Sequence, residues 1–276
     1  MTESPTEDTQ ARKKAGLTLT GVLVAAIVLI GGVIAVVVAH YVTAPAPAPR
    51  APGATTPPAV ATSTSGAGGA AEENALAAQP MVQLPAQAAQ PQAMTTATAG
   101  PAITVPKPTV TTGRWIPGGF PGTPEGALGQ LKALDETAMT AADPQVYARG
   151  YRELAESGAP DPGSTGLASL LTSMRARAQL PATGSVTGLS ATYQVTHGQI
   201  KGTASGGRYV VACVLGQFSV GVNGQLVSVG VGDCQAMRWT GSDWRIASAA
   251  LAAPAPSAWP GSADAVKAGY RELSGS

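Results

Sequence analysis

The stretch RYVVACVLGQFSVGVNGQLVSVGVGDCQAMRWT, residues 208–240, decides how the rest of this chain is interpreted. It contains two long runs of β-branched and small residues, separated by Asn223-Gly224. This dipeptide favours a type I′ turn because both of its residues tolerate the positive φ angles that the turn requires. We therefore expect a β-hairpin in which the numbers of directly facing residues add up to 447.

The cysteines test this register. Cys213 and Cys234 are the two cysteines of the chain, and because their numbers add up to 447 they face each other directly. Counted from the turn, they form a non-hydrogen-bonded pair, whose Cα atoms lie about 4.5 Å apart and within disulfide range. We expect a disulfide bond, with two buried free thiols as the alternative. A bulge at Gly216, Gly230 or Gly232 would shift the pairing.

The face of the hairpin opposite the cysteines is apolar. In the expected register it carries Val210, Ala212, Val214, Phe218, Val220, Val227, Val229, Val231, Met237 and Trp239. Alternation with one apolar face is typical of strands that pack against other elements. We expect this face to form the core of the domain.

Three helices are expected before the hairpin. Thr123-Pro124 and Asp143-Pro144 each combine an N-cap residue with proline at the first helical position. Ser164 or Thr165 begins the third helix. Apolar residues then recur at helical spacing in all three segments, namely Leu128, Leu131 and Leu134, then Val146, Tyr147, Tyr151 and Leu154, then Leu167, Leu170, Leu171 and Met174.

The pattern changes to that of strands after residue 181. Short alternating runs contain Tyr193, Val195 and Ile200, and a second hairpin is expected over 238–246. A terminal helix is expected over 262–273. This order predicts an α+β domain, in which three N-terminal helices pack on a curved antiparallel sheet with a C-terminal helix.

One pentapeptide occurs twice. Gly-Tyr-Arg-Glu-Leu stands at 150–154 and again at 269–273, and both copies fall on expected helices. There the tyrosine and the leucine, three positions apart, share a face. The repeat indicates two similar helices that pack on one sheet or on a partner, or a coincidence of biased composition.

The N-terminal part has the pattern of a membrane anchor. Residues 17–39 carry no charge and no proline, and as a helix they are long enough to cross a bilayer core of about 30 Å. Arg-Lys-Lys precedes them at 12–14, and no Lys or Arg follows until Arg50. The positive-inside rule predicts a cytoplasmic tail over 1–16, a transmembrane helix over 17–41 and an extracytoplasmic remainder. A cleaved signal peptide is the alternative, although its apolar region would be shorter.

The next segment, residues 42–112, is dominated by Ala, Pro, Thr, Gln and Gly. Such a composition buries too little apolar surface to offset the entropy lost on ordering. We expect a disordered linker here, followed by a folded extracytoplasmic domain over 113–276, so that protease releases a core beginning near residue 113. Acidic and basic residues are nearly balanced in this domain, which argues against direct nucleic-acid binding.

The domain offers few candidates for chemistry. His197, its one histidine, is expected on an exposed turn at a strand end. Asp135 and Glu136 adjoin on a helix and point to different sides, so they do not form an acid–base pair. Arg175 and Arg177 are expected on a solvated helix face. Because no metal-ligand spacing, nucleophile motif or phosphate-binding loop occurs, we expect no enzymatic activity, no metal and no cofactor.

Tyr193, Trp239 and Trp244 are the candidate pocket residues. They can line a cavity between the helices and the sheet, or fill it as core aromatics. An open pocket with converging polar groups would favour a ligand-binding or enzymatic domain, whereas a filled interior would favour a scaffold.

Four stretches carry a resemblance: RWIPGGFPGTPEGALGQLKALDETAM (114–139), DPQVYARGYREL (143–154), VGDCQAMRWTGSDWRI (231–246) and SAWPGSADAVKAGYREL (257–273). They look like actinobacterial, streptomycete-type single-pass membrane proteins of integrative or conjugative elements. The architecture is also similar to the bitopic scaffold subunit of type IV secretion systems, whose outer domain has a nuclear-transport-factor-two-like cone.

The resemblance implies a membrane-anchored extracytoplasmic scaffold or accessory protein of a conjugation or secretion apparatus. Its partners would be the lipid bilayer, through residues 17–41, and other proteins that span the membrane or the cell wall, including further copies of itself. The alternative is a small-ligand-binding or enzymatic domain of the same fold, which would use the cavity between helices and sheet. Both roles are expectations from architecture.

Overall fold

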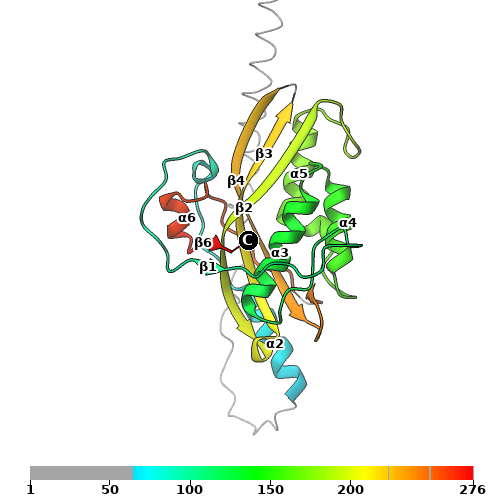
Figure 1. Cartoon of the computed structure of the whole chain (residues 1–276), viewed down its shortest axis with the longest axis vertical. Helices are drawn as coiled ribbons and strands as arrows, with labels where there is room; N and C mark the ends of the chain where they lie inside the picture. Colours follow the sequence, from blue (N-terminus) through cyan, green and yellow to red (C-terminus); the bar gives the residue numbers. More distant parts are fainter. Residues whose placement is uncertain (1–64, 223, 249, 276) are drawn as a thin grey trace, which may run out of the picture.

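The computed structural model describes residues 65–222, 224–248 and 250–275. A curled six-stranded sheet lies at the centre, in the order β1-β6-β2-β3-β4-β5 (Figure 1). Neighbouring strands are antiparallel except β1 and β6, which are parallel. The strands are β1 (Ile103–Thr104), β2 (Leu189–Ala204), β3 (Tyr209–Val222), β4 (Gln225–Trp239), β5 (Trp244–Ile246) and β6 (Arg271–Ser274). The mixed α+β class is confirmed.

The expected hairpin register is confirmed along the whole β3–β4 pair. Val222 faces Gln225, and the pairing continues without a bulge to the far end of both strands. Cys213 faces Cys234 directly, and the two form a disulfide with a Cα–Cα distance of 4.1 Å. The glycines of both strands therefore leave the register intact.

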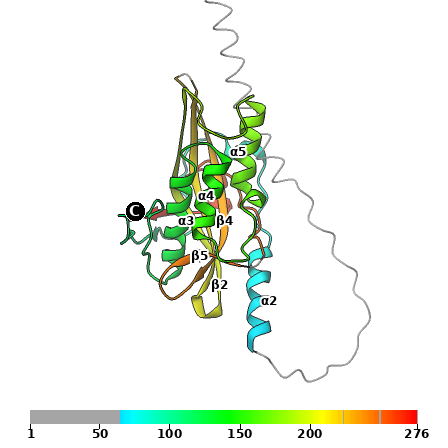
Figure 2. The same cartoon turned by 90° about the vertical axis from the view of Figure 1, so that its right-hand side faces the viewer.

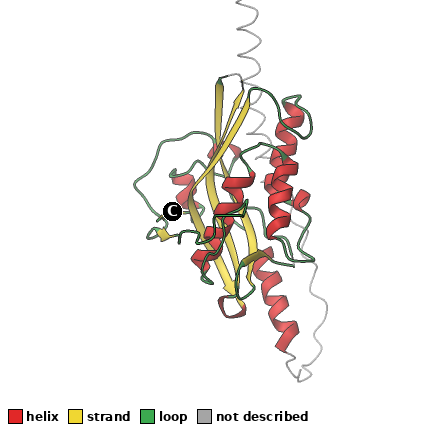
Figure 3. Cartoon of the chain, turned by 45° about the vertical axis from the view of Figure 1, so that its right-hand side comes forward, coloured by secondary structure: helices red, strands yellow, loops and turns green. Residues whose placement is uncertain are grey.

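The three helices expected before the hairpin are present, and they lie between β1 and β2 in the chain. They are α3 (Pro124–Ala138), α4 (Pro144–Leu154) and α5 (Gly166–Arg177). The side chains of Thr123, Asp143 and Thr165 cap them by accepting backbone N–H groups of the first turn. Figures 2 and 3 show the three helices side by side on one face of the sheet.

We call the side of the sheet under these helices the helix-covered face. It is the apolar face expected from the sequence, and Val214, Phe218 and Val231 are buried there. Leu128, Leu131 and other large side chains of the helices pack onto it. Large interlocking side chains thus make the main core.

The opposite side of the sheet, which carries Cys213 and Cys234, is the disulfide face. A second layer covers it, and most of the buried residues of this layer are alanines. The layer consists of α2 (Ser65–Ala78), the 3-10 helix η1 (Ala86–Ala89), the segment 250–259 and α6 (Ala263–Lys267). The prediction of a disordered linker is therefore wrong for 65–112, whereas 42–64 lies outside the described residues.

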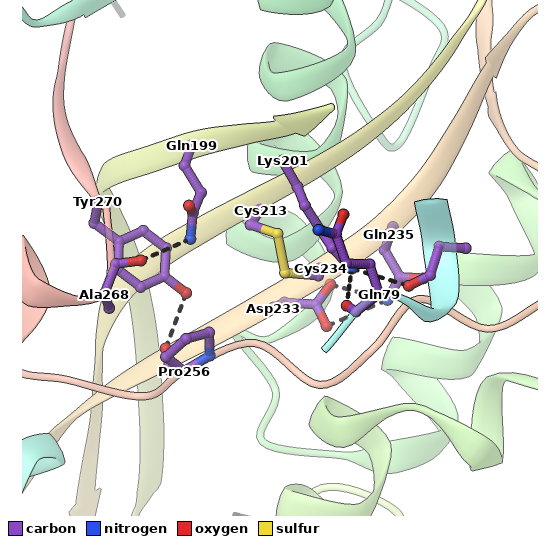
Figure 4. The surroundings of a disulfide bond; sticks show 11 residues. Gln79, Gln199, Lys201, Cys213, Asp233, Cys234, Gln235, Pro256, Ala268 and Tyr270 are labelled. Atoms are coloured by element: carbon purple, nitrogen blue, oxygen red, sulfur yellow. Dashed lines mark hydrogen bonds between the residues drawn. A yellow bond between two sulfur atoms is a disulfide. The ribbon is translucent and has the colours of Figure 1, made fainter. Parts of the chain in front are cut away.

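Specific polar contacts hold this layer. The Glu73 carboxylate of α2 accepts two hydrogen bonds from the Arg238 guanidinium, at 2.9 and 2.8 Å. Lys201, at a bulge of β2, donates to the backbone oxygens of Ala77 and Gln79 at the end of α2 (Figure 4). A bulge re-aims a side chain, and a cation stabilises a helix C-terminus.

Two glycines of β4 let the second layer approach closely. A Cβ atom at Gly230 would lie 1.8 Å from the oxygen of Ala258, and one at Gly232 would lie 2.4 Å from the oxygen of Pro256. The backbone of 256–258 therefore rests directly on the strand. These glycines serve close packing, and neither causes the register shift considered from the sequence.

The C-terminal helix is shorter than expected. α6 begins at its Ser262 cap but ends at Lys267, and the chain continues as β6 instead of a helix to residue 273. Gly269, with φ near +90°, takes the left-handed conformation that terminates helices. The second copy of the pentapeptide consequently lies in a turn and a strand, while the first lies in α4, so the repeat does not mark two similar helices.

Arg175 departs from the expectation of a solvated face. Its side chain is fully buried and donates to the backbone oxygens of Ala142, Pro181 and Gly184. It thereby fixes the loop after α5, and Arg177 is exposed as expected.

The predicted cytoplasmic tail and transmembrane helix, residues 1–16 and 17–41, lie outside the described residues. Within the part of the chain that the structure describes, none of the helices combines the length and hydropathy needed to cross a bilayer.

Candidate functional site

A pocket of about 100 Å³ opens beside β4, where the N-terminus of α5 meets the segment 251–257. Its lining is mostly apolar, and Val82 and Leu251 at its rim are both more than a third exposed. The polar members of the lining include Thr165, Asp233, Gln235 and Ser257. This pocket is the candidate site because ligand pockets typically combine mostly apolar walls with a few polar groups, and here one of these is a buried carboxyl group.

Strand alternation places the carboxyl group. Asp233 faces Val214 across the hairpin, so its side chain lies on the helix-covered face together with Gln235, two residues on. The Gln235 side-chain amide donates to both carboxyl oxygens, at 3.2 and 2.9 Å (Figure 4). Both residues are almost completely buried, at 4% and 2% exposure.

A second carboxyl group lies deeper in the core. Asp135 of α3 is fully buried, and neither of its side-chain oxygens has a hydrogen-bond partner among the described residues. The hydroxyl of Tyr151 on α4 is likewise buried without a partner in this part of the chain, and the buried hydroxyl of Tyr147 has only the side chain of Thr165 within reach. We call Asp135, Asp233, Tyr147 and Tyr151 the acid–tyrosine cluster.

Burial is the largest cause of the raised pKa values in this cluster. It raises the pKa of Asp233 to about 6, while hydrogen bonds from Gln235 and from the Cys234 backbone act in the opposite direction. Burial also raises the pKa of Asp135 well above its usual range, and the charges of Asp233 and Glu136 raise it further. Like charges in a dry site disfavour each other, so the two aspartates do not ionise independently.

The three candidate pocket residues from the sequence fill the interior instead of lining a cavity. Tyr193 is buried, and its hydroxyl donates to the oxygen of Val231 at 2.7 Å. Trp244 is buried and donates to the oxygen of Pro121, also at 2.7 Å. The Trp239 ring packs on Trp244 with centroids 5.5 Å apart. None of the three is in the lining of the pocket beside β4.

His197 is not on an exposed turn. It lies within β2 next to a bulge, between Leu215 of β3 and Glu272 of β6, and it is half-buried. Burial lowers its pKa, so the imidazole is neutral near pH 7. Its Nδ1 lies 2.9 Å from the Thr196 hydroxyl, and it takes no part in the acid–tyrosine cluster.

A second cavity, of about 200 Å³, lies along α3 next to residues 105–108. Two of its charged residues are engaged with each other: Lys132 and Glu136 form an ion pair at 2.6 Å, and Glu136 also accepts the backbone N–H of Val195. Lys107, the third charged residue of the lining, is exposed to solvent. Unlike the pocket beside β4, this cavity is not lined by a buried carboxyl group without a cationic partner.

The sequence also indicates this site, because polar residues stand at positions that belong to the apolar faces. Asp233 and Gln235 share the parity of Val231 and Met237, so the register alone places them on the apolar face. Asp135 stands four residues after Leu131 and hence on the apolar stripe of its helix. Polar residues at core positions mark a functional or strained site more often than chance would give.

Two carboxyl groups and two hydroxyls can hold protons or a cation, but they do not make a metal centre. Among residues 65–275, apart from the undescribed 223 and 249, there is no group of three or more His, Cys, Asp or Glu side chains placed to bind a metal. Only Asp233 of the cluster lines the pocket, so it is the group that a ligand would contact.

Comparison with protein-family models, with curated proteins and with solved structures gives no match to this chain.

Proposed function

We propose that this chain is a membrane-anchored extracytoplasmic scaffold or accessory protein, one that acts through protein–protein contacts, and that it is not an enzyme. The observation that carries the proposal is the filled interior between helices and sheet. Tyr193, Phe218 and Trp244 occupy the space that a substrate would need. Enzymes and ligand carriers of comparable architecture require an open cavity of about 300 Å³ or more for a small organic molecule.

The open edges of the sheet supply a surface for such contacts. β5 pairs only with 237–239 of β4, so the outer edge of β4 near the hairpin tip has no strand partner among the described residues. On the other side, β6 pairs with β2 only at His197 and Gly198. Leu226, at the tip, is 67% exposed. Unpaired strand edges readily add a strand from another chain.

The membrane and secretion parts of the proposal rest on the sequence. Residues 17–41 would anchor the chain, with the domain on the extracytoplasmic side. The Cys213–Cys234 disulfide is consistent with that compartment because disulfides persist where the environment is oxidising. A conjugation or secretion apparatus remains the proposed setting, and copies of this chain or other envelope-spanning proteins are the proposed partners.

Photo-crosslinking of the full-length chain in its native membranes tests the proposal. A photoreactive amino acid at Leu226 should give a crosslinked protein of defined mass, whereas the same amino acid at Glu153, an exposed position on α4, should not. Crosslinking from neither edge strand, at Leu226 or at Ser190 of β2, would contradict an interaction role for this end of the sheet.

A further inference from the structure

The acid–tyrosine cluster lacks a positive counter-charge. The described ion pairs engage Glu73, Asp143 and other acidic residues with arginine or lysine, but they include neither Asp135 nor Asp233. Buried carboxylates are normally paired, because an isolated charge in a low-dielectric interior is strongly destabilising. The site is therefore deficient in positive charge.

The nearest compensating feature is the N-terminus of α5, which lines the pocket at Thr165, Gly166 and Leu167. A helix N-terminus contributes the equivalent of about half a positive charge. The ionised Asp233 carboxylate is therefore only partly compensated. Asp135 and Tyr151, which lie deeper in the core and do not line the pocket, have side-chain oxygens without a hydrogen-bond partner among the described residues, so they supply no compensating positive charge either.

The pocket limits what can meet this need. Its volume of about 100 Å³ is well below that of pockets that hold drug-sized molecules, so only a small group fits. Leu167, Leu170 and the prolines of 254–256 make most of its wall apolar. An anion would be repelled by Asp233, and a hydrated metal ion would find one carboxyl group and apolar walls. An ammonium group on a short alkyl chain matches both the charge and the lining.

We propose that this pocket binds a small primary alkylammonium group, with the Asp233 carboxylate as its counter-charge and the apolar walls around its methylene groups. The ligand can be a free amine or the end of a lysine side chain, since both present the same chemistry. This inference is independent of the proposed interaction role.

Binding of this kind depends on pH with a defined sign. The groups within electrostatic range of Asp233 are Asp135 of α3, Tyr147 and Tyr151 of α4, Tyr193 of β2 and, from the other face of the sheet, Tyr270, and none of these is a cation. The ammonium group binds the ionised carboxylate, so affinity should be highest above pH 6 and should fall about tenfold at pH 5.

The test uses the full chain in detergent and ligand-observed NMR titration with n-butylammonium chloride, n-butanol and sodium butyrate. Only butylammonium should saturate the site, with about tenfold weaker binding at pH 5 than at pH 8. Asp233→Asn should weaken its binding at pH 8 at least tenfold and remove the pH dependence, whereas Glu153→Gln, at an exposed site on α4, should change neither.

Three results would overturn the inference: equal binding of n-butanol and butylammonium, binding by Asp233→Asn that equals that of the unsubstituted chain, or no saturable binding of butylammonium at pH 8. If Asp233→Asn does not fold, the pH series on the unsubstituted chain decides. A peptide with a single exposed lysine, competed against butylammonium, distinguishes a protein-borne ammonium group from a free amine.

Discussion

The two faces of the β3–β4 hairpin are buried in opposite ways. On the helix-covered face, large side chains such as Leu128, Phe218 and Trp244 interlock with three regular helices. On the disulfide face, alanines and bare backbone rest on glycines, and the buried Glu73 carboxylate pairs with the partly buried Arg238. The comparison teaches that a segment with little apolar content can still order, provided that it lies close to a rigid sheet and its polar groups find partners.

The largest expected difference between the two faces is in the loss of stability when one large buried side chain is removed. Phe218→Ala should lower the free energy of unfolding by about 3–5 kcal/mol, because it leaves a cavity among rigid neighbours. Leu84→Ala, in the layer over the disulfide face, should lower it by about 2 kcal/mol, because the thin layer can collapse onto the gap. Urea denaturation measures both, and equal losses would erase the contrast.

The acid–tyrosine cluster gives the helix-covered face its own pH dependence. The folded-state pKa of Asp233 lies near 6, above the ordinary 3.8, so the folded state binds more protons than the unfolded state between these values. Stability should therefore fall by roughly 3 kcal/mol as pH rises from about 4 to 6. Asp135, whose pKa is also raised, contributes a fall of the same sign, so in Asp233→Asn the fall should be smaller but not absent. Denaturation midpoints across this pH range are the measurement, and an unchanged slope in the variant would refute the assignment.

Opening the disulfide should weaken mainly the second layer. Cys213 and Cys234 are 21 residues apart, and closing such a loop is worth about 3 kcal/mol on the chain-entropy model. The paired strands already hold these residues together, so the measured loss for the Cys213→Ala/Cys234→Ala variant should be smaller. Hydrogen exchange should accelerate in 65–112 before it does in α3. Faster exchange in α3 first would contradict the picture of two independently stabilised faces.

The ion pair of α2 should have a smaller and local effect. Arg238→Met should lower stability by about 2 kcal/mol, since it removes charged hydrogen bonds to Glu73, which is buried. Arg238 and the other contacts lower the pKa of Glu73 below 4.5, so the stabilisation is present above that pH and is lost as pH falls further. The free energy of unfolding of the variant and of the unsubstituted chain, measured as pH is lowered, tests this pH dependence. Its direction is opposite to that of Asp233, whose contribution to stability falls as pH rises.

The sequence predicted the helix-covered face well because the signals there are local and regular. Asn223-Gly224 set the register from which the Cys213–Cys234 pairing follows, and cap residues such as Thr123 marked helix starts. These features depend on neighbours in the chain and on simple periodicity.

The disulfide face escaped prediction because its contacts join distant parts of the chain. Glu73 is 165 residues from Arg238, and an Ala- and Pro-rich composition does not predict such a partner. Gly269 ended the terminal helix early, although the apolar spacing continued to Leu273. Leu273 instead faces Ile103 of β1, which is again a long-range pairing.

The buried acids fall between these two cases. The parity of Asp233 was readable from the register, but its proximity to Asp135 was not, because the two residues lie on different elements that only tertiary packing brings together. Spacing rules for metal or catalytic motifs do not detect such pairs.

Limited proteolysis of the full-length chain, followed by mass determination of the resistant core, tests most directly whether 65–112 is a structural layer. The account predicts a core that begins near residue 65 and retains the segment up to 112, because α2 and η1 are held by Glu73, by Lys201 and by contacts with the disulfide face. A stable, folded core that begins near residue 113 would contradict it.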